Sequence, residues 1–157
     1  MGIFGLQGWA RVDIDSEQSD ISNLTDEFIS TNKAWLDYYS EEAGAYYKIL
    51  QSIKIGDILY LKDCDWSKRT LDICAIGIVA DNEMIQENPF AVKYNCLKEV
   101  RWFKLDSYIH IDIRETAKDR ANGDPYAGSV FGITLYEEYS PYIQNIVLNE
   151  IFKLMEK

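Results

Sequence analysis

The sequence contains few of the residues on which most catalytic sites depend. Its 157 residues include one histidine, His110, and three cysteines, Cys64, Cys74 and Cys96. The cysteines are too few and too scattered for a disulfide framework or a zinc finger, so we expect all three to be reduced. A catalytic pair with serine or cysteine would depend on His110 alone, and a structural role in a strand is the expected one. We therefore expect no enzymatic activity and no cofactor.

Positive charge is scarce as well. The chain carries 16 lysines and arginines against 26 aspartates and glutamates, which gives a formal net charge of -10. General affinity for nucleic acid comes from neutralising phosphates, so a surface that binds polyanions everywhere is excluded. A local basic face remains open, because basic residues gather in the middle of the sequence. Its members would be Lys62, Lys68, Arg69, Lys93, Lys98, Arg101 and Lys104.

The sequence shows neither an apolar run of membrane-spanning length nor a recognisable secretory or transit leader. The expected location is therefore the cytoplasm, with no membrane partner. We also expect no bound metal, because no metal-ligand motif is assembled. Asp57, Asp63 and Asp72 flank predicted strands near Lys62, and they leave a metal-dependent nuclease as a weak alternative. Solvated surface charges are the simpler interpretation of these carboxylates.

Apolar and aromatic residues, in contrast, are sufficient for a folded domain. Apolar residues make up 47% of the chain, which has 11 tyrosines, 6 phenylalanines and 4 tryptophans. This composition excludes a disordered chain, and the length fits a single domain over residues 1–157. An acidic, serine-rich excursion around residues 15–31 is expected to run over the surface and to hold one short helix.

The most regular pattern lies between residues 55 and 79. Two apolar runs, Ile58–Leu61 and Ile73–Val79, are rich in β-branched and aromatic residues and predict two adjacent buried strands. Gly77, inside the second run, predicts a bulge or a close backbone approach. The polar connector between the two runs then forms the tip of a hairpin.

Shorter patterns complete the predicted fold. The terminal helix has Pro141 in its first turn, where proline is favoured. This order of elements predicts an α+β protein, most simply a curved or barrel-like mixed sheet flanked by helices. The further strands are expected over Gly8–Ile14, Glu99–Leu105, Tyr108–Ile113 and Val130–Leu135, and the main helices over Ala34–Leu50 and Ser140–Met155.

Four tryptophans are the aromatic residues that the sequence places most clearly. Trp102 lies within a predicted strand and is expected in the core. Trp66 lies in the polar hairpin connector, where core packing explains it least. Trp9 begins the first predicted strand, and Trp35 lies in the first main helix. Stacking of a base on an aromatic ring contributes about 1–3 kcal/mol, so two or three converging rings would form a binding site.

The segments GDILYLKD, ICAIGIV and EVRWFKLDSYIHIDI, followed by a glycine-containing loop and a terminal helix, resemble the core of the PUA-like superfamily, especially its EVE and YTH branch. The resemblance covers residues 54–155 and implies a small mixed barrel of about six strands with flanking helices. Members of that branch bind nucleic acid and hold a modified or flipped base in an aromatic pocket, without catalysis.

The resemblance also implies roles for individual residues. Trp9 matches the position that often supplies one aromatic wall of the pocket, Trp66 lies near the second wall, and Trp35 is a further candidate. The acidic excursion and the negative net charge depart from the family's pattern. The basic residues that would contact the nucleic-acid backbone are Lys62, Lys68 and Arg69.

We therefore predict a non-catalytic module that holds a flat ligand, above all a modified nucleobase in nucleic acid or in a nucleotide. The alternative is an acidic protein-interaction or defence-related factor that binds a basic partner with the same fold.

Overall fold

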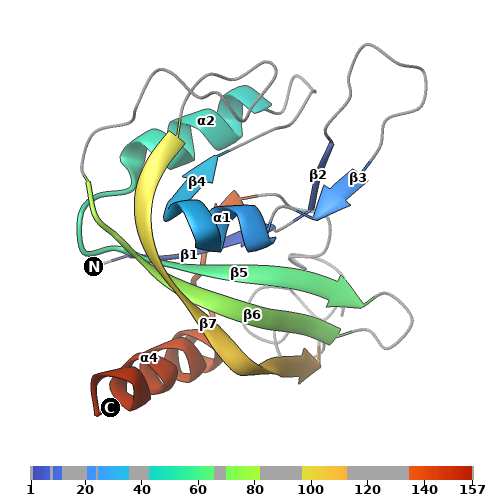
Figure 1. The fold of residues 1–157 in the computed structure, drawn as a ribbon, viewed down its shortest axis with the longest axis vertical. Helices are drawn as coiled ribbons and strands as arrows, with labels where there is room; N and C mark the ends of the chain where they lie inside the picture. The colour runs from blue at the N-terminus through green and yellow to red at the C-terminus, as the bar shows by residue number, and fades with distance from the viewer. Residues whose placement is uncertain are drawn as a thin grey trace.

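The computed structural model describes residues 2–7, 9–11, 21–23, 25–35, 43–65, 70–81, 97–112 and 135–156. These residues form a six-stranded sheet of order β4-β7-β6-β5-β1-β8, which curls into a half-barrel (Figure 1), and a separate ribbon of β2 and β3. The predicted α+β class and barrel-like sheet are confirmed at this level. The helices are α1 (Thr25–Thr31), α2 (Ala43–Ser52) and α4 (Pro141–Met155). The strands are β1 (Ile3–Gln7), β2 (Trp9–Arg11), β3 (Ile21–Asn23), β4 (Lys33–Trp35), β5 (Ile58–Asp65), β6 (Thr70–Val79), β7 (Leu97–Asp112) and β8 (Leu135–Glu137).

The hairpin of β5 and β6 is the predicted central pair of strands, and it lies in the middle of the sheet. β6 also pairs antiparallel with β7, while β5 pairs parallel with β1. β8 and β4 then add antiparallel strands at the two edges. Because the hairpin is flanked by strands on both edges, its backbone hydrogen bonds are satisfied within the sheet.

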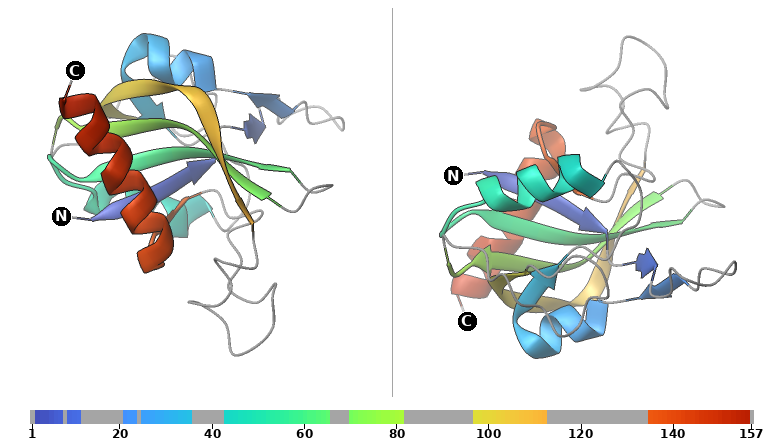
Figure 2. Two further views of the ribbon diagram at one scale, coloured as in Figure 1. Left: turned by 90° about the horizontal axis from the view of Figure 1, so that it is seen from below. Right: turned by 90° about the horizontal axis from the view of Figure 1, so that it is seen from above.

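Helices pack on both sides of the sheet and divide the core into two clusters. On one side, which we call the α1 face, Leu61 packs with Phe28 of α1 and Leu50 of α2. On the other, the α4 face, Tyr60 packs with Ile143 of α4. Figure 2 shows α4 crossing one side of the sheet while α1 lies on the other. Burial on both sides explains why β5 begins and β6 ends as a nearly continuous apolar run.

An irregularity in β6 bends the sheet. On the β5 side, Ala75 pairs with Leu61 and Ile73 pairs with Lys62, so Cys74 is one extra residue in β6. On the β7 side the register shifts at the same place, where Lys104 and Ile109 are the partners of Ala75 and Ile73 and β7 has three extra residues. Cys74 and Ala75 both belong to the α1-face core, as expected where one extra residue interrupts the alternation. A bulge of this kind increases strand twist, which suits a sheet that curls into a half-barrel.

The two strands predicted over residues 99–105 and 108–113 are one strand, the 16-residue β7. The sequence pattern broke because β7 changes its register with β6 in this region. Val100 and Trp102 do share one face, as predicted, because Val100 pairs with Val79 and Trp102 pairs with Gly77.

Gly77 allows Trp102 to reach the core. A Cβ atom on Gly77 would lie 2.4 Å from Val100 Cγ1 and 2.6 Å from Trp102 Cε3, distances that real contacts do not reach. The predicted close approach is therefore confirmed. Trp102 is 6% exposed, and its Nε1 donates a hydrogen bond of 2.9 Å to the carbonyl oxygen of Lys33. The predicted core position of Trp102 is also confirmed.

The prediction missed the first strand of the sheet, β1, which begins at Ile3. Of the strand predicted over Gly8–Ile14, Trp9–Arg11 is confirmed as β2, and residues 8 and 12–14 lie outside the described residues. Gly5 weakened the strand pattern of β1, yet it is required there by packing. A Cβ atom at Gly5 would lie 2.4 Å from Cζ of Tyr136 on the neighbouring β8.

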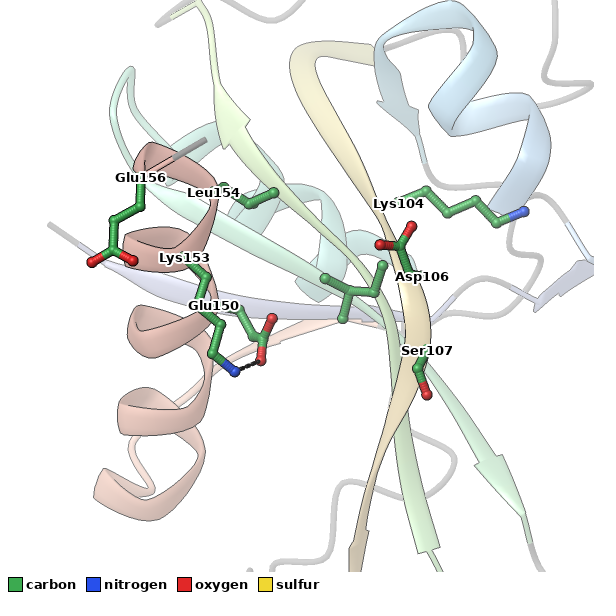
Figure 3. Close-up of a pocket in the computed structure, with 8 residues that line it drawn as sticks. Lys104, Asp106, Ser107, Glu150, Lys153, Leu154 and Glu156 are labelled. Atoms are coloured by element: carbon green, nitrogen blue, oxygen red, sulfur yellow. Dashed lines mark hydrogen bonds and ion pairs between the residues drawn. The ribbon is translucent and has the colours of Figure 1, made fainter.

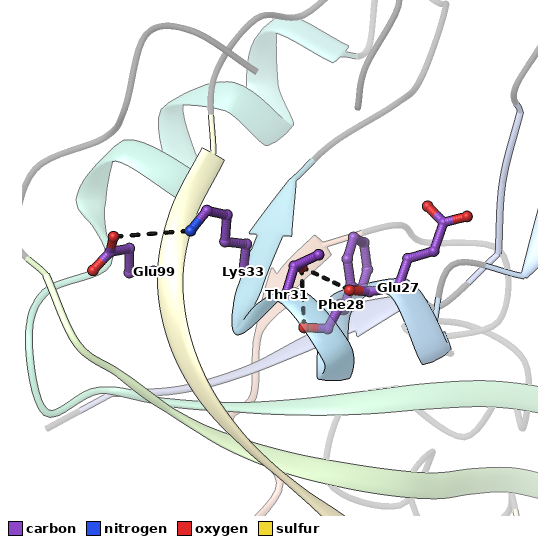
Figure 4. A network of polar contacts seen from close by, with 5 residues as sticks. All are labelled: Glu27, Phe28, Thr31, Lys33 and Glu99. Atoms are coloured by element: carbon purple, nitrogen blue, oxygen red, sulfur yellow. Dashed lines mark hydrogen bonds and ion pairs between the residues drawn. The ribbon is translucent and has the colours of Figure 1, made fainter. Parts of the chain in front are cut away.

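The predicted helix over Ala34–Leu50 was wrong at its beginning, because Lys33–Trp35 forms β4 and α2 begins at Ala43. α1 ends near Thr31, whose Oγ1 donates to the carbonyl oxygen of Glu27 at 2.6 Å. Asn32 then adopts a φ of +55°, a conformation that ends helices and that asparagine tolerates. The chain can therefore turn directly into β4 (Figure 4).

The terminal helix is confirmed. Ser140 caps α4, because its Oγ accepts a hydrogen bond of 3.4 Å from the Ile143 amide, and Pro141 lies in the first turn. The predicted strand over Val130–Leu135 is seen only from Leu135, where β8 begins, and residues 130–134 lie outside the described residues. In the part of the chain that is described, no helix is long and apolar enough to cross a membrane.

Candidate functional site

A row of three polar side chains crosses the sheet near the tip of the central hairpin. Asp63 of β5 pairs with Asp72 of β6, and Asp72 pairs with His110 of β7. Paired residues on neighbouring strands point to the same side of a sheet, about 5 Å apart. We call these three residues the Asp-His row.

The Asp-His row lies on the α1 face. Leu71 and Ile73, on either side of Asp72, belong to the α4-face core. Ile109 and Ile111 enclose His110 in the same way, since Ile111 belongs to that core and Ile109 packs against it. Alternation therefore directs both Asp72 and His110 to the opposite side of the sheet.

His110 is held in place by Asp72 and remains open to solvent. Its Nδ1 lies 2.7 Å from Asp72 Oδ1, and the side chains are 62% and 14% exposed, respectively. A carboxylate at Nδ1 fixes the proton there, so in the neutral ring Nε2 is a hydrogen-bond acceptor. Asp72 was not predicted as a partner of His110. The signal was present, because each of these polar residues stands alone between two apolar residues of a strand.

Polar groups continue around the row. Lys104, which pairs with Ala75 and so lies on the same face, forms an ion pair of 3.6 Å with Asp26 at the start of α1. Thr70, two residues before Asp72, has a buried Oγ1 without a hydrogen-bond partner among the described residues. A buried hydroxyl of this kind requires a partner, which a ligand or water can provide.

Cys74, the bulged residue beside the row, does not supply a nucleophile. It is free, as predicted, and buried. Burial raises the pKa of its thiol to about 11, and Asp63 acts in the same direction. A thiol that stays protonated at neutral pH is inert as a nucleophile. Cys64 is described only as backbone, and Cys96 lies outside the described residues.

The structure describes the backbone of two of the tryptophans that the resemblance proposed as pocket walls, Trp9 and Trp35. Trp9 in β2 follows Gln7 by two residues, and Gln7 pairs with Lys62, which is next to Asp63. The backbone of Trp9 is thus close to the Asp-His row. Trp35 pairs with Leu97, at the opposite end of β7 from His110.

Trp66, Lys68 and Arg69 lie outside the described residues. Their connector begins after Asp65 and ends before Thr70, and these two residues pair with each other. The connector therefore begins and ends at the end of the hairpin that carries the Asp-His row.

Lys62 is not part of an exposed basic face, which corrects its predicted position. Its side chain is fully buried on the α4 face, where Nζ lies 5.0 Å from the centre of the Tyr136 ring. Lys98 is also fully buried, and its Nζ donates to the carbonyl oxygen of Ile53. Of the other described basic residues in the middle of the chain, Arg101 and Lys104 are exposed.

The three carboxylates considered for a nuclease do not come together. Asp57 lies before β5, at the opposite end of that strand from Asp63, and its two oxygens accept hydrogen bonds from the Gly2 and Lys54 amides. Among the described residues, no group of three histidine, cysteine or carboxylate side chains could hold a metal ion.

A hollow of about 590 Å³ lies between β7 and the C-terminal part of α4 (Figure 3). Its charged lining includes Asp106 and Glu156, and Glu150 forms an ion pair of 3.1 Å with Lys153. Lys104 also lines it, but this side chain extends toward α1 (Figure 3). Apart from Lys104, the charged lining of the hollow is therefore mainly acidic.

The described residues form a curled α+β half-barrel with the Asp-His row at one end. This assigns the protein to a structural class. No protein-family model and no curated protein matches the chain.

Proposed function

We propose that this protein is a non-catalytic binding module for a flat ligand, most of all a modified or unpaired nucleobase, and that the Asp-His row contacts the edge of that base. The observation that carries the proposal is the exposed His110 ring, which Asp72 holds in one orientation. A fixed polar side chain loses little freedom on binding, so its hydrogen bonds contribute more to affinity.

The chemistry of the row suits the edge of a base. Bases offer amino donors and ring-nitrogen or carbonyl acceptors on their edges. Asp63 and Asp72 carry carboxylates, which accept from an amino group, and His110 offers Nε2 as a second contact. A base with an exocyclic amino group therefore fits better than one with carbonyl groups alone.

The aromatic part of the pocket would come from Trp9 and Trp66. The first belongs to β2, which follows β1 directly at this end of the sheet, and the second belongs to the connector that starts at Asp65. A base held by the row at its edge could stack on either ring, for about 1–3 kcal/mol per ring. Phosphate attraction is weak in a chain of charge -10, so stacking and edge contacts must provide most of the affinity.

The test is a fluorescence titration of the wild type and four variants against short oligonucleotides with and without base methylation, and against free nucleotides. We expect His110→Ala and Asp72→Asn to weaken binding about tenfold, the cost of a charge-assisted hydrogen bond. Trp9→Ala and Trp66→Ala should weaken it by about 1–3 kcal/mol each. Single-stranded or mispaired sites should bind better than duplex, because extracting a paired base costs a few kcal/mol.

Asp106→Asn is the matched control, since it also changes an aspartate to its amide but lies outside the row on β7. It should bind as the wild type does. If the wild type binds none of these ligands, or if the folded His110 and tryptophan variants all bind normally, the proposal is wrong. Magnesium-dependent cleavage that Asp72→Ala abolishes would instead support a nuclease.

The acidic alternative, binding of a basic protein partner, is favoured by the hollow between β7 and α4. Asp106 and Glu156 line it, while exposed apolar side chains, Phe152 at 59% and Met155 at 74%, lie on the same part of α4. Substitution of Asp106 and Glu156 by their amides would weaken such a complex and leave base binding unchanged. Within the base-binding proposal, a salt series separates nucleic acid from a free nucleotide, because binding to a nucleic-acid backbone weakens steeply with salt whereas capture of a free nucleotide does not.

A further inference from the structure

A second hollow, of about 500 Å³, lies where β4 meets β7, and it gathers positive charge on an acidic protein. Lys33 of β4 and Arg101 and Phe103 of β7 line it, together with Asn32, Ala80 and Glu99. Phe103 pairs with Ile76, a member of the α4-face core. Alternation along β7 directs Arg101 and Phe103 to this same face, so the hollow lies on the opposite side of the sheet from the Asp-His row.

Arg101 is oriented by an aromatic ring instead of an acid. Its guanidinium carbon lies 5.7 Å from the centre of the Phe103 ring, and its side chain is exposed. Among the described residues Arg101 has no ion pair, although the chain carries 26 acidic groups against 16 basic ones. A guanidinium stacked on a ring keeps its five N–H donors in one plane and available for another partner.

Lys33 is only loosely neutralised. Its Nζ lies 3.9 Å from Glu99 Oε1 across the pair of β4 and β7 (Figure 4), and the two side chains are 28% and 47% exposed. An ion pair this long and this open to water contributes little. Lys33 can therefore turn its ammonium group toward a ligand in the hollow with little loss.

We propose that this hollow binds a phosphate group, either inorganic or carried by a nucleotide. Glu99 pairs with Lys33, and Arg101 follows Glu99 by two residues on the same side of β7, so Lys33 and Arg101 are diagonal neighbours across the two strands, about 7–8 Å apart at the backbone. A phosphate has oxygens directed to several sides and can contact both cations at once. The planar guanidinium matches two of those oxygens, and the ammonium adds a point charge. The inference does not depend on the proposed base-binding function.

The test is a nuclear magnetic resonance titration of the full chain with inorganic phosphate, adenosine monophosphate and a four-nucleotide oligothymidylate. We expect amide shifts at Glu99–Phe103 for at least one of them. Arg101→Gln should weaken that binding at least tenfold and Arg101→Lys less, because lysine keeps the charge but loses the planar fork. Equal affinities for phosphate and the nucleotide identify the phosphate group as the sole determinant, and tighter binding of the nucleotide adds its base or sugar.

Two matched controls separate a built site from general charge. Lys153→Gln removes an exposed lysine of α4, outside the hollow, and should change nothing. Glu99→Gln should strengthen binding by freeing Lys33, while Glu150→Gln, the same change on α4, should not. The proposal is overturned if none of the three probes shifts residues 99–103, or if Lys153→Gln and Arg101→Gln weaken binding equally. Unshifted resonances of α2, which carries none of these substitutions, show that each variant folds.

Discussion

Two polar clusters lie on opposite sides of the sheet and share only strand β5. On the α4 face, Tyr60, Tyr136 and Glu138 form a closed network that is almost fully buried. On the α1 face, the Asp-His row is open, and His110 is exposed. Lys62 and Asp63 are neighbours in the chain, yet Lys62 belongs beside the closed network and Asp63 belongs to the row. The direction in which a strand residue points therefore separates a structural role from one open to a ligand.

The closed network satisfies its polar atoms internally. The Tyr60 hydroxyl donates to Glu138 Oε2 at 2.6 Å and lies 2.6 Å from the Tyr136 hydroxyl. The Ser140 amide donates to Glu138 Oε1 at 3.0 Å, and Gln144 donates to the Glu138 carbonyl oxygen at 2.7 Å. These bonds connect β5, β8 and the start of α4, so the network joins the C-terminal helix to the sheet.

The largest loss of stability should come from the core of the α1 face. Trp102→Ala removes a buried ring and its hydrogen bond to Lys33, so it should lower the free energy of unfolding by about 3–5 kcal/mol in a urea titration. Trp66→Ala, in the hairpin connector, should be close to neutral. Equal losses for the two variants would show that the assignment of Trp102 to the core and Trp66 to the tip is mistaken.

Breaking the closed network should cost nearly as much. Glu138→Ala leaves the Tyr60 hydroxyl and the Ser140 amide buried without their acceptor, at a cost of about 3 kcal/mol in total. Glu138→Gln keeps an acceptor and should lose less. Both values come from the same urea titration, and a neutral Glu138→Ala would mean that water reaches the network.

Cys74 belongs to the α1-face core beside the Asp-His row. Because its thiol is buried, the free energy of unfolding should depend on pH. Its pKa is raised from an ordinary 9.0 to about 11 in the folded protein. Between these values the unfolded chain has already lost the proton that the folded chain keeps, so stability falls as pH rises, by up to about 1.4 kcal/mol per pH unit.

The measurement compares wild type with Cys74→Ala in urea titrations between pH 8 and pH 11. Only the difference between the two slopes reports on Cys74, because tyrosines and lysines titrate in the same range. Parallel slopes would mean that the thiol ionises in the folded protein as it does in the unfolded chain.

The smallest change in stability should come from the open row. His110 is exposed, and an ion pair of this kind contributes little, so Asp72→Asn and His110→Ala should each change the free energy of unfolding by less than about 0.5 kcal/mol. A loss comparable to that of Glu138→Ala would make the row a structural network like the one on the α4 face.

The sequence predicted the fold correctly in those segments where the local pattern of apolar residues matches their burial in the structure. The β5–β6 hairpin, the core position of Trp102 and the capped α4 were all predicted. The prediction was wrong for β1, where Gly5 is needed beneath Tyr136, and for β4, where three residues form a strand because β7 pairs with them. In both places a contact between distant segments overrides the local pattern.

For the candidate site, the predictions failed on the surroundings of individual side chains. It proposed Lys62 as a surface contact, and the structure buries that side chain against Tyr136. It treated His110 as an isolated strand residue, and the structure places Asp72 at 2.7 Å from it. The ligand-binding roles of Trp9, Trp35 and Trp66 and the backbone contacts of Lys68 and Arg69 stay predictions.

The sequence by itself determined the α+β class, the central hairpin and the terminal helix, because alternation, turn residues and helix caps act within a few residues of one another. Only the tertiary structure decided that Lys62 is buried while Asp63 turns to the other side, that Asp72 meets His110, and that Arg101 lies on Phe103. These outcomes depend on strand register and on which helix covers which side of the sheet. Both are settled by contacts between residues far apart in the chain, which a local pattern does not contain.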